Sequence, residues 1–158
     1  TESAAQVQRA IEAAFFPPLG KRGITGGRIT GFGRLPLPEY IDLANRQTPI
    51  IPMIESRAGV DALGEILQLP GVGMIMEGAL DLSLDLDLGP DPLNPQVWQT
   101  LQNMADACLS AAIPFCANPR TAEQNTLWRA RGIRSFLAGE DRGLLHNALK
   151  ARLHSLQQ

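Results

Sequence analysis

Short apolar runs alternate along this chain with longer segments whose apolar residues recur at helical spacing. The runs are PIIPMI, VGMIME, IPFCA and IRSFLA, at 49–54, 72–77, 113–117 and 133–138. None of them alternates apolar with polar positions, so we expect parallel strands that are covered on both faces. Helical spacing follows at 57–68, 95–112, 121–131 and 140–155. Strand followed by helix, repeated in this way, predicts a βα array.

Two further helices precede the first strand. Residues 3–16 have apolar residues at helical spacing, and Ser3 is placed to cap the helix at its N-terminus. PPLG then ends the helix, and a glycine-rich loop follows. A second helix is predicted at 38–46, where Pro38 occupies the first turn. No composition shift or long linker divides the chain, so we expect a single domain over residues 1–158.

Composition narrows the possible partners. The 158 residues are 44% hydrophobic and 19% charged, which is enough apolar material for one packed core. The formal net charge is −2, so no electrostatic field favours nucleic acid or anionic lipid. No apolar run reaches the roughly 18 residues that a membrane span needs. Cys108 and Cys116 lie in a helical and a strand pattern, which is typical of packed, reduced thiols and favours a cytoplasmic location.

Carboxylates occur where the predicted strands end. Glu55 ends the first apolar run, Glu77 ends the second, and Asp81 follows shortly after; Asn118 and Asp141 come after the third and fourth runs. The C-terminal ends of parallel strands lie on one rim, and active-site residues are usually found there. Oxygen ligands of this kind suit Mg²⁺ or Mn²⁺. An equally good interpretation is that each acid caps the following helix or pairs with an arginine, and spacing does not decide between the two.

Four blocks of sequence carry a resemblance to a known family. They are PPLGKRGITGGR, YIDLANRQTPIIPMIES, LPGVGMIMEGALDLSLDLDLG and GIRSFLAGED, at 17–28, 40–56, 69–89 and 132–141. In this order they resemble the HpcH/HpaI aldolase and citrate lyase family. That resemblance implies a (β/α)8 TIM barrel and an enzyme that forms or cleaves a carbon–carbon bond next to a 2-keto acid such as pyruvate or oxaloacetate.

The resemblance also implies a site. Glu55 and Asp81 match the family's metal ligands, and backbone N–H groups of Gly78, Ala79 and Leu80 match the group that holds the keto-acid carboxylate. A divalent metal, Mg²⁺ or Mn²⁺, is therefore the expected cofactor. Because the metal stabilises the developing negative charge, no lysine Schiff base is required.

Within the family, GITGGRITGFG together with EGALDLS is most similar to the citrate synthases of siderophore biosynthesis, of the staphyloferrin B type. Those enzymes join oxaloacetate to acetyl-CoA, and Arg28 in the glycine-rich loop is a candidate to contact the CoA tail. The favoured interpretation of this segment is a structural loop in which Arg22 or Arg28 pairs with acids at the rim. The usual aldolase sequence has Gly-Pro where this chain has Gly78-Ala79, and a glutamine where it has Met53. A metal-dependent aldolase or an acyl-CoA lyase is the alternative.

The length predicts only part of a barrel. A full barrel takes about 250 residues, so this chain corresponds to the C-terminal half, with four parallel strands and their helices. The arginine and histidine that the family uses for catalysis would lie in the first half, so no catalytic residue can be assigned here. Four strands leave two open edges, which predicts a partner half and a homo-oligomer. The other possibility is a truncated, non-catalytic half-barrel.

Overall fold

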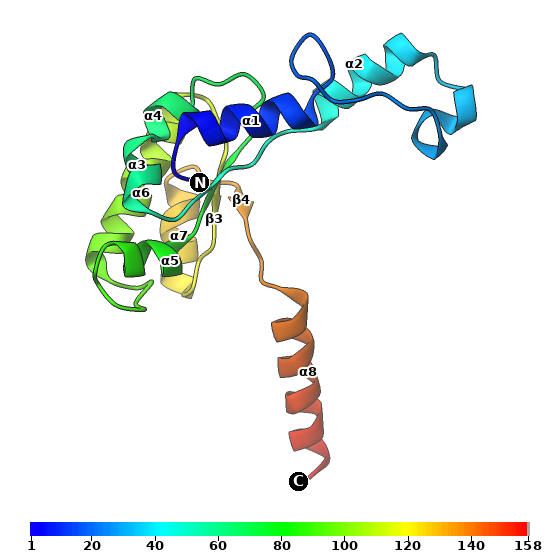
Figure 1. The fold of residues 1–158 in the computed structure, drawn as a ribbon. Coiled ribbons are helices and arrows are strands. Elements are labelled where there is room, and N and C mark those ends of the chain that lie inside the picture. The colour runs from blue at the N-terminus through cyan, green and yellow to red at the C-terminus, as the bar shows by residue number, and fades with distance from the viewer. Residues whose placement is uncertain (158) are drawn as a thin grey trace.

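Four parallel strands form the centre of the molecule (Figure 1). The structure is a computed structural model and describes residues 1–157. The strands are β1 (Met53–Ile54), β2 (Ile75–Glu77), β3 (Phe115–Ala117) and β4 (Ser135–Phe136), adjacent in chain order. All three neighbouring pairs are parallel, with Ile54 beside Glu77 and Met76 beside Cys116. The four predicted strands are confirmed, although each is shorter than its apolar run.

The helices follow the predicted order with two differences. They are α1 (Ala4–Ala14), α2 (Leu37–Gln47), α3 (Arg57–Asp61), α4 (Leu63–Ile66), α5 (Ala79–Asp85), α6 (Pro95–Ser110), α7 (Ala122–Ala130) and α8 (Asp141–Leu156), with a 3₁₀ segment η1 (Arg28–Gly33) before α2. The helix predicted at 57–68 is two short helices that meet at Ala62. Helix α5 was not predicted, because its leucines recur at every second position and hide the helical period.

Side chains cap several of these helices as the sequence suggests. The hydroxyl of Ser3 accepts a hydrogen bond from the Gln6 N–H at the start of α1, as predicted. Thr121 caps α7 in the same way through the N–H of Gln124. Such caps satisfy backbone donors that have no partner within the helix, and each stabilises it by about 1 kcal/mol.

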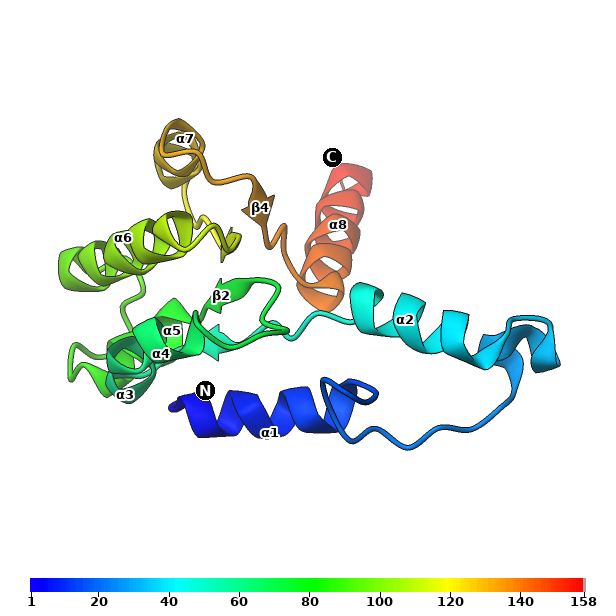
Figure 2. The same cartoon turned by 90° about the horizontal axis from the view of Figure 1, so that it is seen from above.

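The core lies between one face of the sheet and helices α1 and α3–α7 (Figure 2). Ile54 and Ile75 are fully buried there, and Phe115 packs against the ring of Trp128 with centroids 5.6 Å apart. The opposite face of the sheet carries Met53, which is 37% exposed. Cys116 of β3, on the same face, is only 6% exposed, so the expectation that both faces are covered fails at β1 and not at β3.

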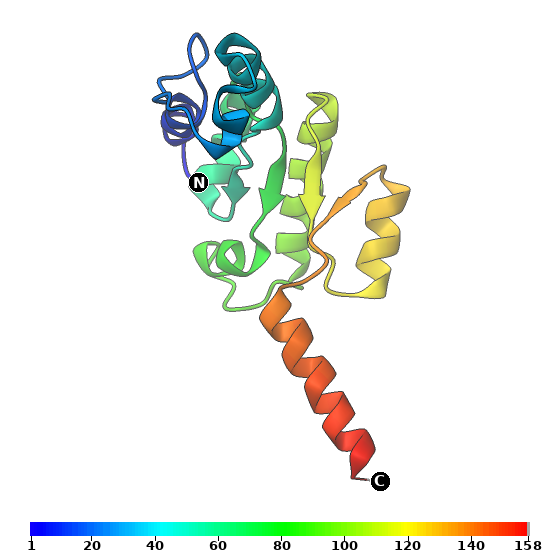
Figure 3. The same cartoon turned by 90° about the vertical axis from the view of Figure 1, so that its right-hand side faces the viewer.

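Two segments extend away from this core. The arm made by η1 and α2 projects to one side of the sheet, and α8 points away from the strand ends (Figures 1 and 3). No residue of α8 is buried. Among residues 1–157, no helix combines the length and the apolar character that crossing a bilayer requires.

Candidate functional site

Glu55 follows β1 directly and lies against the backbone of Gly78. A Cβ atom at position 78 would come within 2.8 Å of Glu55 Oε2 and 2.5 Å of Glu55 Cβ, so only glycine leaves room for this carboxylate. The Glu55 side chain is 34% exposed and reaches solvent at the rim. The amino nitrogen of Thr1 lies 4.0 Å from its Oε1. Ser56, not Glu55, caps the following helix, because its hydroxyl accepts from the Gly59 N–H.

Asp81 lies in the first turn of α5, three residues beyond Gly78, and is exposed. The helix dipole favours an acid in this position, but Asp81 neither caps α5 nor pairs with an arginine within residues 1–157. Its carboxylate makes no hydrogen bond or ion pair within residues 1–157. Glu55 and Asp81 thus come from adjacent strand–helix connections, as predicted, and both carboxylates remain available to a ligand.

The turn that links β2 to α5 offers fewer free backbone donors than the family resemblance implies. The N–H of Gly78 donates to the Ile54 carbonyl at 3.0 Å, as part of the sheet. The N–H of Ala79 lies close enough to the Glu77 carboxylate to lower the pKa of that group. The N–H of Leu80, in the first turn of α5, has no hydrogen-bond acceptor within residues 1–157.

Glu77 differs sharply from Glu55, although both end strands. Its side chain is fully buried, and its carboxylate accepts from the Asn118 N–H at 2.7 Å and from Arg120 Nη1 at 3.0 Å. Burial raises the pKa of Glu77, while the Asn118 N–H and the Arg120 guanidinium oppose that rise. For Glu77 the simpler interpretation, pairing with an arginine, is therefore confirmed. Sequence reasoning missed Arg120, whose only signal is its place after the third apolar run.

Arg28 lies in η1 on the projecting arm, well away from α5 and the Gly78–Leu80 turn (Figures 1 and 2). Its guanidinium is exposed to solvent. This chain alone does not bring Arg28 to the rim site, so a role in binding CoA stays a prediction that requires an additional surface beside the arm.

A divalent cation fits the residues at this rim. Within residues 1–157, no set of three or more His, Cys, Asp or Glu side chains is arranged to hold a metal ion. Two carboxylates are nevertheless a sufficient protein contribution for Mg²⁺, which often takes its other ligands from substrate and water. The space that Gly78 leaves for the Glu55 carboxylate is the structural feature that favours such a site.

The cysteines take no part in this arrangement. Cys108 and Cys116 are buried and not joined by a disulfide, as predicted. Burial raises the pKa of the Cys108 thiol to about 12, which leaves it protonated and unreactive.

Comparison with known proteins identifies the family. The sequence profile of the HpcH/HpaI aldolase/citrate lyase family matches residues 1–145, and the chain belongs to that family. A hydroxypyruvate/pyruvate aldolase of Chromohalobacter salexigens is 34% identical over 112 residues, covering 70% of this chain and 43% of that protein. The family assignment confirms the resemblance found in the sequence.

Solved structures confirm the fold. The citrate synthase SbnG matches with a TM-score of 0.86 and 30% identity, over 100% of this chain and 60% of that one. An HpcH/HpaI aldolase from Desulfitobacterium hafniense matches with a TM-score of 0.90 and 23% identity, over 100% of this chain and 61% of that one. The chain therefore spans about 60% of these proteins, as expected for part of a barrel that has four parallel strands.

Proposed function

We propose that this chain supplies one half of the active site of an enzyme that acts next to the keto group of a 2-keto acid, with citrate formation from oxaloacetate and acetyl-CoA as the favoured reaction. The observation that carries the proposal is the placement of Glu55 against Gly78, next to the helix turn that carries Asp81. Family membership supports the reaction class.

The same rim chemistry serves bond formation and bond cleavage. When acetyl-CoA adds to the keto carbon of oxaloacetate, negative charge develops on the keto oxygen; when an aldol bond breaks, charge develops on the keto oxygen of the departing enolate. A divalent cation, when bound, supplies the Lewis acidity that stabilises this charge. Glu55 and Asp81 would hold the cation, and the Leu80 N–H would donate to the keto-acid carboxylate.

Citrate formation is favoured over aldol cleavage on two grounds. The first is that Gly78-Ala79 and Met53 depart from the usual aldolase sequence. The second is that the citrate synthase SbnG is 30% identical to this chain, compared with 23% for the structurally similar HpcH/HpaI aldolase. Aldol cleavage is the second candidate, supported by the similarity to a hydroxypyruvate/pyruvate aldolase. An acyl-CoA lyase is the third and differs from the first in its products.

A half-barrel needs further surface to complete this site. The Met53 face of the sheet is open at β1 within residues 1–157, and both β1 and β4 are edge strands. We therefore propose that a second half-barrel completes the ring and supplies the arginine and histidine expected by family resemblance. If this chain associates with no second half-barrel, it is a truncated half-barrel without catalytic activity.

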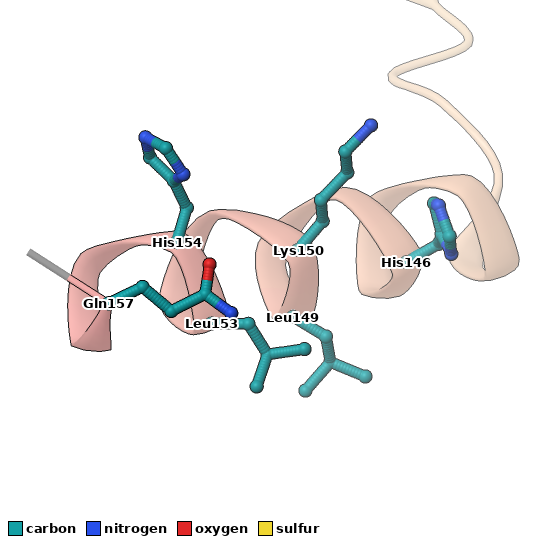
Figure 4. Close-up of a pocket in the computed structure, with 6 residues that line it drawn as sticks. All are labelled: His146, Leu149, Lys150, Leu153, His154 and Gln157. Carbon is teal, nitrogen blue, oxygen red and sulfur yellow. The ribbon is translucent and has the colours of Figure 1, made fainter.

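Helix α8 supports a homo-oligomer. Five of its leucines are more than half exposed: Leu144, Leu145, Leu149, Leu153 and Leu156. Leu149 and Leu153 lie on one side of the helix, while Lys150 and His154 point to the other (Figure 4). We propose that a second copy covers this leucine side, since α8 projects beyond the strand ends, whereas the remaining strands of a barrel belong beside β1 and β4 (Figure 3). Light scattering would show a dimer or larger assembly, and a monomer at high concentration would contradict it.

The cellular location of the protein is predicted from its cysteines. Two buried, unpaired thiols are typical of a reducing compartment, so we place the protein in the cytoplasm. Fractionation of the native cell would test this placement directly.

The reaction is tested by separate product assays. Purified protein of verified intact mass is supplied with oxaloacetate and acetyl-CoA, or with pyruvate and an aldehyde, each with and without Mg²⁺ or Mn²⁺. Citrate together with free CoA supports the first candidate, and aldol products support the second. Glu55→Gln and Asp81→Asn should each abolish metal-dependent activity without unfolding the protein, whereas Asp61→Asn, an exposed acid on α3, should change neither.

A further inference from the structure

The buried carboxylate of Glu77 joins two loops that the sequence keeps far apart. One oxygen accepts from the N–H of Asn118, and the other accepts from Arg120 Nη1, both in the β3–α7 loop. The carboxylate also lies close to the N–H of Ala79, in the turn that follows β2. Arg120 Nη1 in addition donates to the Asn118 carbonyl at 2.7 Å, which holds its own loop in place.

Burial makes this pair unlike an ordinary surface salt bridge. The Glu77 side chain is fully buried and that of Arg120 is 21% exposed. Moving two charges out of water costs about as much as their attraction returns, so a buried pair contributes little net stability compared with well-packed apolar residues. Such a pair is better explained by the single arrangement that it enforces, because each of its hydrogen bonds has a fixed direction.

The arrangement that it enforces is that of the candidate site. Glu77 immediately precedes the turn that carries Leu80 and Asp81, and Gly78 in that turn contacts Glu55. A shift of the turn would therefore move Asp81 relative to Glu55. Distances between metal ligands tolerate only small errors, and partners outside the ligand set commonly change metal affinity when they are removed.

We infer that Glu77 and Arg120 are positioning residues, which fix the Gly78–Asp81 turn against the β3–α7 loop and thereby hold Asp81 beside Glu55. The inference rests on the proposed function in one respect, namely that the Gly78–Asp81 turn contributes to a metal site. The link itself is a property of the fold that is measured without any ligand.

Glu77→Gln and Arg120→Met test this link in the purified protein by two independent measurements. The first is hydrogen exchange, which should become faster in the segments 78–81 and 118–120 while the β1 and β3 cores keep wild-type protection. The second is titration with Mn²⁺ alone, in which we expect roughly tenfold weaker binding. The double variant should be no worse than either single variant, because both changes break one shared contact.

Matched controls separate position from charge. Glu65→Gln removes an exposed carboxylate from α4, and Arg152→Met removes an exposed guanidinium from α8. Neither should alter local exchange or Mn²⁺ affinity. Arg120→Lys should restore part of the Mn²⁺ affinity, because it keeps the charge but makes fewer hydrogen bonds.

The outcomes distinguish this inference from the proposed function. Wild-type exchange in both segments of Glu77→Gln overturns it. Uniformly faster exchange throughout the core also overturns it, because the pair would then contribute only general stability. Unchanged Mn²⁺ affinity alongside local loosening shows that the link does not position a metal site, which overturns the inference as well. If the wild-type protein binds no Mn²⁺, the proposed metal site fails, whereas local exchange still decides whether the link fixes the turn.

Discussion

Gly78→Ala tests the candidate site most directly, because it adds one carbon atom where the Glu55 carboxylate now lies. The new Cβ would come 2.5 Å from Glu55 Cβ and 2.8 Å from Glu55 Oε2, with Met53 Cγ at 3.3 Å. The backbone itself permits the change, because Gly78 has φ −126° and ψ 68°, outside the left-handed region. The expected effect is therefore steric and falls on Glu55.

The magnitude follows from the overlap. Ordinary carbon–carbon contacts lie near 3.5–4.0 Å, so the Glu55 stem must move by about 1 Å. Overpacking of this kind costs typically 1–3 kcal/mol. We expect the lower end of that range, because Glu55 is partly exposed and can turn outward. A loss of about 1 kcal/mol lowers Tm by about 2–4 °C for a chain of this size.

Metal binding should suffer more than stability. A carboxylate displaced by about 1 Å no longer matches its partner ligand, so Mn²⁺ affinity should fall about tenfold or more. Calorimetric titration and thermal melts on the same samples measure both effects. The matched control is Gly64→Ala, because a methyl group there would have no atom within 4 Å and helix α4 accepts alanine. Wild-type Mn²⁺ affinity in Gly78→Ala would refute the placement of Glu55 in a metal site.

Three further predictions concern groups outside this contact. Because burial raises the pKa of Glu77, the folded state holds its proton more tightly than the unfolded chain, so the free energy of unfolding should fall as pH rises from the unfolded pKa through the raised folded one. Urea melts from about pH 4 to about pH 8 should show this slope, and Glu77→Gln should remove it; an unchanged slope contradicts the assignment. With its pKa near 12, Cys108 should resist iodoacetamide in the folded protein, as should buried Cys116, and both should react in urea. Rapid native labelling of Cys108 would show that the core opens readily. Arg28→Ala should raise the KM for acetyl-CoA with no change in Tm, in contrast to Arg152→Ala on α8, which should change neither; an unaltered KM removes Arg28 from the binding surface.

The sequence by itself determined the order of the elements. Apolar runs, helical spacing and local caps such as Ser3 depend on neighbours within a few residues, so they can be recognised without the fold. The family blocks likewise identified Glu55 and Asp81 as candidates. Helix α5 escaped this kind of prediction, because its alternating leucines do not show which face becomes buried until α6 packs beside it.

The tertiary structure alone separated the two acids that end strands. In sequence both Glu55 and Glu77 close an apolar run, and a run without polar alternation does not show which side of the strand faces the helices. In the sheet, Glu77 lies on the same side as buried Ile75, whereas Glu55 lies on the side of exposed Met53. Side-chain direction alternates along a strand, so the packing of distant helices decided that one carboxylate binds Arg120 and the other remains at the rim.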